Sequence, residues 1–354
     1  MLYAFGRYIL MPGISSTVRH RTGGQQEYPT AASFFLAADS QIQYCEHSRG
    51  IVMKIREVIQ KIKNYHYGYI PGENGPERIN DRISRDQVLY GDPEKECTGI
   101  VTTCWANMDV IREAGKRGVN LIICHEALFW NHGDHTEWLV QRHNKTFRKK
   151  AELLDEYGIT VWRDHDYIHS GIPVGNGRYA DGIFYGLADT LGWTEYIDTE
   201  TSALMEQIHG WDGFAAKGRL NPLSYVIPPV SAGQLASFLV SRLNLCGAKI
   251  TGNADRIVSC VSVSFHIFGD ANELITLADE GKTDCFLSME IVDYTLAEYV
   301  RDAAENGPVI IGIGHFNIEE PGMKYMVNWL PEAIGEEIPC SFVQSGDSAR
   351  YILR

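Results

Sequence analysis

The chain has 354 residues and a formal net charge of −13, with 32 Lys and Arg against 45 Asp and Glu. Its 44% hydrophobic and 22% charged residues are typical of a globular protein of about two domains and exclude an intrinsically disordered chain. The acidic charge argues against a nucleic-acid partner, which needs a basic face for its phosphates.

The eight cysteines form no C-x-x-C pair, and most of them lie in apolar runs. This pattern predicts buried free thiols in a reducing compartment, and neither a disulfide framework nor a cysteine zinc site is expected. The expected location is therefore cytoplasmic. No uninterrupted apolar run of about 18 residues occurs, so we expect no membrane-spanning segment and no membrane partner.

Residues 1–52 differ in composition from the rest of the chain. The first 26 residues contain Arg7, Arg19 and Arg21 but no acidic residue, which is typical of an organelle presequence. The alternative, which we favour, is an upstream extension ahead of a start at Met53, where a clean amphipathic helix begins. On either interpretation this segment is a disordered leader or extension outside the functional core.

From Met53 onward, predicted helices and strands alternate. In chain order they are a helix at 53–64, a loop at 70–82, a strand from 99, a helix at 108–116, a strand from 120, a helix at 137–157, a strand from 159 and a helix at 181–191. Ser231 is expected to cap a helix that runs to Leu243. Three further strand–helix units follow, with the strands IVSCVSV, DCFLS and PVIIGIG. This alternation predicts parallel βαβ units and an α/β fold.

Side chains that can bind a metal follow three of the predicted strands. They are, in chain order, His125 and Glu126, then His165, Asp166 and His169, then His315 and, four residues later, Glu319. Ligands of an open parallel sheet bind where the strands end at their carboxyl side. Imidazole and carboxylate donors together favour zinc, manganese or iron over magnesium or a thiolate site.

Each of these residues also has a simpler explanation. A single histidine after a strand is more often a hydrogen-bonded loop or core residue than a ligand. His125 and Glu126 do not begin an H-E-x-x-H zinc motif, because Phe129 stands where the second histidine is required. Only the coincidence of three strand ends makes a metal site as plausible as this simpler explanation.

Four segments together resemble a known family: VLYGDPEKECTGIVTTC, NLIICHEALFW, DHDYIHSGIPVGNGRYADGIFYGLADTLGW and IGIGHFNIEEPGMKYMVNWL. They are similar to the dinuclear-metal-centre, ring-forming hexameric family, which includes the GTP cyclohydrolase I type 2 homologues and the Ngg-interacting factor three proteins. The resemblance runs from Met53 to about Arg354. Its most specific part is Gly-His-x-x-x-Glu followed by a helix, here Gly314, His315 and Glu319.

The resemblance implies a homo-hexamer and a centre of two divalent ions (Zn, Mn or Fe). The implied metal ligands are His125, Glu126, His169, His315 and Glu319. The chain has His125-Glu126-Ala127 where the family has His-His-Pro, and His169 where the family has the aspartate of His-x-x-x-Asp. One carboxylate has thus exchanged places with one histidine, so the formal ligand charge stays at −2. The family's Thr-Gly-Asp/Glu reads Ser288-Met289-Glu290.

A water held between two ions would be activated as the nucleophile of a hydrolysis, with Glu126 or Glu319 as the bridge between the ions. His165 is expected either to be catalytic, as a proton shuttle beside the ligands, or to make an ordinary loop hydrogen bond. The predicted substrate-binding residues are His132 and His135, in the loop after the first ligands, and Asn176 and Arg178, in a glycine-rich turn. For the histidine loop, a solvated loop is the alternative.

Two functions remain open from the sequence. The first is a metal-dependent hydrolase of a small metabolite, such as a nucleotide-like compound, and the alternative is a non-catalytic, metal-stabilised oligomeric scaffold or regulatory protein. The expected fold is α/β, with two interlinked lobes of mostly parallel strands and flanking helices. Residues 53–195 and 307–354 are expected to form the metal-binding lobe, and residues 196–306 a second lobe inserted into it.

Overall fold

The structure is a computed structural model, and it describes residues 53–72, 75–131, 133–210, 218–267, 271–291, 293–303, 306–335 and 337–352. The described residues all belong to one compact unit. The expectation for residues 1–52 therefore lies outside the described residues. Within the described part of the chain, no helix is long and apolar enough to cross a membrane.

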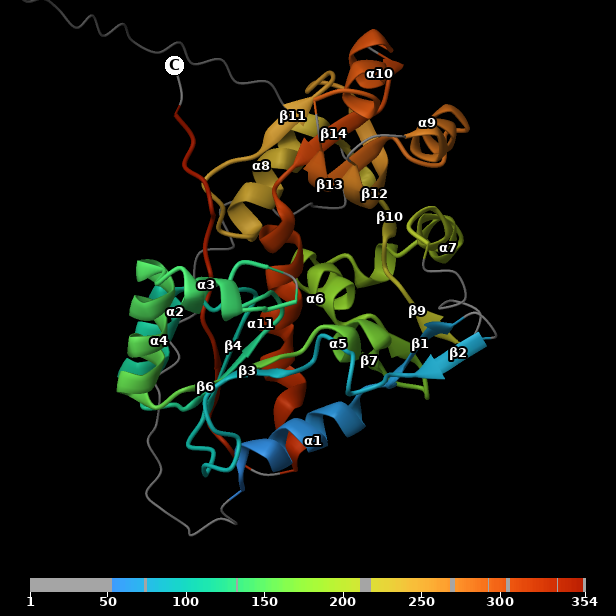
Figure 1. Cartoon of the computed structure of the whole chain (residues 1–354). Helices are drawn as coiled ribbons and strands as arrows, with labels where there is room; N and C mark the ends of the chain where they lie inside the picture. Colours follow the sequence, from blue (N-terminus) through green and yellow to red (C-terminus); the bar gives the residue numbers. More distant parts are fainter. Residues whose placement is uncertain are drawn as a thin grey trace, which may run out of the picture. The chain divides into compact units, whose positions relative to one another are not determined.

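A first five-stranded sheet carries the strands that were predicted before residue 165 (Figure 1). Its order is β15 (Cys340–Phe342), β4 (Ile100–Thr103), β5 (Leu121–Cys124), β6 (Thr160–Arg163) and β3 (Val88–Tyr90). Strands β15, β4, β5 and β6 run parallel, and β3 is an antiparallel edge. All residues of the three central strands are buried, as the continuous apolar runs of a parallel sheet require.

Neighbouring residues of these strands point into different cores. Ile122 packs in a cluster with residues of α2 (Met108–Lys116) and α4 (Lys145–Tyr157). Leu121 and Ile123 belong to a larger cluster with α1 (Ile55–Tyr65) and α11 (His315–Ile334), as expected for the twofold alternation of a strand covered on both faces.

A second five-stranded sheet contains the three later strand predictions (Figure 1). Its order is β10 (Ser224–Ser231), β12 (Ile257–Ile267), β13 (Cys285–Ile291), β14 (Val309–Gly312) and β11 (Lys249–Thr251). Strands β12, β13 and β14 are parallel, and both edges are antiparallel. Its helices are α7 (Thr199–Ile208), α8 (Ala232–Arg242), α9 (Asn272–Asp279) and α10 (Leu296–Asp302). Ser231 caps α8 as predicted.

Helix α11 links the two sheets. It follows β14 of the second sheet, contacts β4 and β15 of the first, and packs most extensively on α6 (Gly182–Leu191). Gly186 and Gly322 allow this close approach, because a Cβ on Gly186 would lie 2.5 Å from the Cα of Gly322. The predicted α/β class with mostly parallel strands is confirmed. The division at residues 195/196 and 306/307 stays a prediction, with β14 hydrogen-bonded in the second sheet.

Local details differ from the predictions in two places. The expected helix at 137–157 is two helices, α3 (Glu137–Gln141) and α4, because His143 has a φ of +50° and Asn144 caps a new helix through the amide of Phe147. The expected loop at 70–82 contains a hairpin of β1 (Tyr69–Gly72) and β2 (Gly75–Arg78). The remaining short elements are α5 (Asp166–Ser170), β7 (Ile172–Pro173), β8 (Tyr179–Ala180), β9 (Arg219–Leu220) and a 3-10 turn at Thr194–Tyr196.

Candidate metal centre

The carboxyl ends of strands from both sheets meet at one cluster of histidines and carboxylates. His125 and Glu126 follow β5, His165 immediately precedes α5 after β6, and His315 begins α11 after β14. Two groups of these side chains have ligand atoms within 4.8 Å of one another: His125 with His165 and His169, and His125 with Glu126 and Glu319. The structure thus brings together all five ligands implied by the resemblance.

The distances within the carboxylate-rich group match those around a shared ion. The Nε2 atom of His315 lies 3.1 Å from Oε1 of Glu319 and 3.4 Å from Oε1 of Glu126. The Nε2 atom of His125 lies 3.6 Å from Oε1 of Glu319. Ligand atoms around a tetrahedral ion with bonds of about 2.0–2.1 Å are about 3.3 Å apart. The donors are therefore already spaced for coordination.

His125 is oriented by the main chain. Its Nδ1–H donates to the carbonyl oxygen of Asp164 at 3.0 Å, because a carbonyl can only accept. Its Nε2 atom is fully buried and has no hydrogen-bond partner. A buried polar atom without a partner is costly unless a ligand satisfies it, and a carbonyl on the opposite nitrogen is the usual support of a metal-binding histidine.

His169 is oriented by a carboxylate. Its Nδ1 atom is 2.8 Å from Oδ2 of Asp181, while Oδ1 of Asp181 caps α6 through the amides of Ile183 and Phe184. Burial lowers the pKa of His169, but the charge and hydrogen bond of Asp181 outweigh burial and raise it above its usual value. The Asp–His pair fixes the tautomer that presents Nε2, as in carboxylate–histidine–metal triads.

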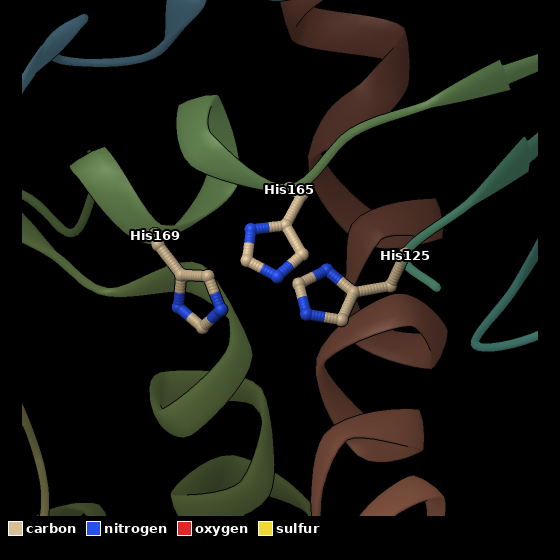
Figure 2. Close-up of side chains that lie close together, drawn as sticks. All are labelled: His125, His165 and His169. Carbon is tan, nitrogen blue, oxygen red and sulfur yellow. The ribbon is translucent and has the colours of Figure 1, made fainter. Parts of the chain in front are cut away.

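His165 lies beside this group in a different role. Its ring stacks on that of His125, with centroids 4.5 Å apart and planes 6° from parallel (Figure 2). In-plane lone pairs of parallel rings cannot converge on one ion, so in this arrangement the two histidines do not share one. Nδ1 of His165 is 3.1 Å from Asp166, and Nε2 accepts from Arg85 at 3.2 Å. Burial and the neighbouring His125 and His169 hold the pKa of His165 well below its usual value.

His315 is surrounded by carboxylates. Nδ1 of His315 is 2.7 Å from Oε1 of Glu290, the last-but-one residue of β13. Burial lowers the pKa of His315, but hydrogen bonds with Glu126, Glu290 and Glu319 outweigh it and raise the pKa to about 12. Burial raises the pKa of Glu319, but His125 and His315 together hold it well below its usual range. The His315 ring is therefore protonated, and its positive charge balances the surrounding carboxylates as a bound metal ion would.

Arg163, at the end of β6, connects the first ligand pair to the following loop. Its Nε–H donates to the carbonyl oxygen of His125 at 2.9 Å, and its Nη2 lies 3.6 Å from Glu126. Its Nη1 lies 3.7 Å from Asp134, which accepts from the amide of Phe129. The side chain of Arg163 is only 1% exposed, so these contacts lie inside the protein.

The predicted substrate-binding residues that the structure describes lie in exposed loops and turns. His132 lies outside the described residues. His135 is exposed, and its amide donates to Asn131 within the same loop. Asn176 and Arg178 are exposed in the turn between β7 and β8. Their assignment to a substrate stays a prediction.

The sequence did not reveal the orienting role of four side chains around the cluster, of which Asp166 was expected only as a possible metal donor. They are Arg85, which bonds His165; Asp181, which holds His169; Glu290, which holds His315; and the Asp166 carboxylate on His165. Two signals were present: Asp181 precedes a helix, as N-caps do, and Glu290 occupies the family's Asp/Glu position. Nothing in the local sequence distinguished Arg85.

The chain is similar to known proteins. Residues 178–347 match the family model described as Duf34/NIF3 (NGG1p interacting factor 3). A GTP cyclohydrolase 1 type 2 homolog of Clostridium perfringens is 22% identical over 76% of this chain and 88% of its own length. One from Escherichia coli K12 is 24% identical over 72% of this chain and 90% of its own length.

The fold also has solved relatives. A crystal structure of a hypothetical protein from Staphylococcus aureus superposes with a TM-score of 0.56 at 17% identity, covering 85% of this chain and 100% of that one. At this identity the likeness concerns the fold alone. The family model and the curated relatives thus match the family that the sequence motifs indicated, the Duf34/NIF3 family.

Proposed function

We propose that the chain is a dinuclear metal-dependent hydrolase of a small metabolite. The observation that carries the proposal is the set of nitrogen–oxygen separations of 3.1–3.6 Å among His125, Glu126, His315 and Glu319. His169, oriented by Asp181, adds a fifth donor on the other side of His125. The mixed imidazole and carboxylate set suits zinc, manganese or iron.

The tautomers limit how two ions could be held. With Nδ1–H on the Asp164 carbonyl, His125 has one lone pair, at Nε2, and so can ligate one ion only. Any side chain shared by two ions would then be a carboxylate. Glu319 would suit that role best, because it faces both His125 and His315 and also raises the pKa of His169 electrostatically.

When bound, two ions would polarise a water and an electrophilic substrate carbonyl or phosphoryl group. The chain's own residues hold the ligands in place through Asp164, Asp181 and Glu290. His165 stays neutral, since burial lowers its pKa, and a neutral imidazole can accept a proton at Nε2. We propose His165 as the proton acceptor next to the ligands.

We also propose that the chain assembles into a homo-hexamer in the cytoplasm. Exposed apolar side chains on and just before α3 support an interface between subunits: Trp130, Trp138 and Val140 are 42%, 49% and 57% exposed. The seven cysteines in the described ranges are free thiols, as a reducing compartment requires. The alternative function, a metal-stabilised scaffold without turnover, rests on the same interface.

A substrate panel separates the two functions. The purified protein, loaded with Mn, Zn or Fe, is assayed on GTP, chromogenic phosphoesters and small amides. The hydrolase proposal expects turnover that Glu126→Gln and His315→Ala abolish. Turnover that survives both ligand substitutions would refute this site. Absence of turnover, with loss of the oligomer on metal removal, would favour the scaffold.

A further inference from the structure

An arginine at the edge of the metal centre is bonded to the histidine that we place next to the ligands. Nη1 of Arg85 donates to Nε2 of His165 at 3.2 Å, and Nε of Arg85 lies 3.0 Å from Oδ1 of Asp166. The Arg85 side chain is 50% exposed, whereas the side chain of His165 is 11% exposed. Arg85 therefore faces solvent on one side and the histidine cluster on the other.

Arg85 is close enough to touch a molecule bound at the centre. The ligand atoms of His125, His165 and His169 lie within 4.8 Å of one another. Nη1 of Arg85 lies 3.2 Å from Nε2 of His165, one member of this group. A small substrate that contacts His125 or His169 would therefore extend to the guanidinium.

The segment that carries Arg85 is fixed rather than loosely attached. The Arg85 amide donates to Asp166 at 3.0 Å, and buried Asp86 accepts from the amides of His165 at 2.8 Å and Tyr167 at 3.1 Å. The amide of Arg163 donates to the carbonyl oxygen of Gln87, the residue after Asp86, at 3.0 Å. This main-chain bonding positions the guanidinium relative to the metal ligands, as a recognition group requires.

The guanidinium still has bonding capacity. Of its five N–H groups, the contacts to His165 and Asp166 use two. An arginine fork binds two oxygens of a phosphate or carboxylate at once, more strongly than a neutral donor pair. In a chain with a net charge of −13, such an anion needs a local positive group, and Arg85 supplies one at the edge of the cluster.

We propose that Arg85 binds an anionic oxygen pair, phosphate or carboxylate, of the substrate at the rim of the metal centre. This inference rests on the proposed metal-dependent function. When Arg85 turns to the anion, its contact with Nε2 of His165 is lost, so anion binding changes the surroundings of that ring. Anion recognition and the His165 ring are thereby coupled through one side chain.

The binding test uses the zinc-loaded full chain and calorimetric titration with phenyl phosphate, and benzoate as the carboxylate arm. Arg85→Gln should weaken binding of the preferred anion by about 10–100-fold, the range for hydrogen bonds to charged groups. The matched control, Arg82→Gln, removes the same charge from the same segment and should change the affinity less than twofold. Unchanged binding in Arg85→Gln, or equal losses in both variants, would overturn the proposal.

A second readout tests the coupling to His165. In ¹⁵N spectra of the histidine rings, the anion should shift the Nε2 resonance of His165 in the unchanged protein but not in Arg85→Gln; His165→Gln assigns the resonance. A His165 resonance that ignores the anion would overturn the coupling. Zinc content is measured on the same samples. Failure to bind zinc would refute the proposed function, whereas normal zinc content with Arg85-independent anion binding would refute only this inference.

Discussion

Metal uptake should release a proton from His315. The pKa of this histidine is raised to about 12, because hydrogen bonds with Glu126, Glu290 and Glu319 outweigh its burial. At pH 8 the ring is therefore fully protonated, and the proton must leave before Nε2 can bind an ion. Glu126 and Glu319 release none, because their pKa values are lowered and both are already ionised.

The magnitude follows from this proton balance. We expect about one proton per chain from His315 and a further fraction from His169, whose pKa Asp181 raises. The apparent metal affinity should rise about tenfold for each pH unit between pH 7 and pH 9. In the metal-free protein a rise in pH has an unfavourable effect, because it lowers the stability of the fold. The stability that protonated His315 contributes is complete below its unfolded pKa of about 6.5 and is lost as the pH rises toward about 12.

The assay is calorimetric titration of zinc in buffers of different ionisation enthalpy. The slope of the apparent enthalpy against buffer enthalpy gives the number of protons released. His315→Gln should reduce that number by about one, and His135→Ala in the exposed loop should leave it unchanged. A slope near zero in the unchanged protein would refute the picture of an imidazolium held among carboxylates.

Three further predictions concern the supports of the site. Asp181→Asn should lower metal affinity by about 10–100-fold by weakening the hold on His169; asparagine still caps α6, so thermal unfolding should change little, and a large loss of stability would contradict this. Burial and the charges of Asp164 and Asp166 raise the pKa of Asp86 to about 7, so its ionisation lowers the stability of the fold as the pH rises from the unfolded pKa of about 3.9 to about 7; Asp86→Asn should raise the unfolding temperature more at pH 8 than at pH 5. Gly186→Ala should cost about 1–3 kcal/mol of unfolding free energy, because its Cβ would meet Gly322; a denaturant midpoint equal to that of the unchanged protein would contradict it.

The strand ends were the most predictable part of the fold. The runs before His125, His165 and His315 are apolar and short, and each is a strand buried in a parallel sheet, so their polar ends had to lie at carboxyl edges. The hairpin at β1 and β2 was missed, because its Gly/Pro-rich sequence favours turns and its strands are largely exposed. The break before α4 depends on the positive φ of His143, which no periodicity reports.

The ligands were more predictable than the residues that orient them. Ligand types are recognisable by chemistry and spacing, whereas Arg85 and Glu290 reach the site from segments 80 and 25 residues away from the histidines they bond. Such contacts depend on how the two sheets are placed, which local sequence does not encode.

The central claim is that five residues of one chain bind two metal ions, and counting the ions tests it most directly. The protein is dialysed to equilibrium against excess zinc or manganese, and bound metal is measured by mass spectrometry. The account predicts two ions per chain, at most one in Glu319→Gln, which removes the proposed bridge, and two in the exposed control His135→Ala. Well under one ion per chain in the unchanged protein, or two ions in Glu319→Gln, would contradict it.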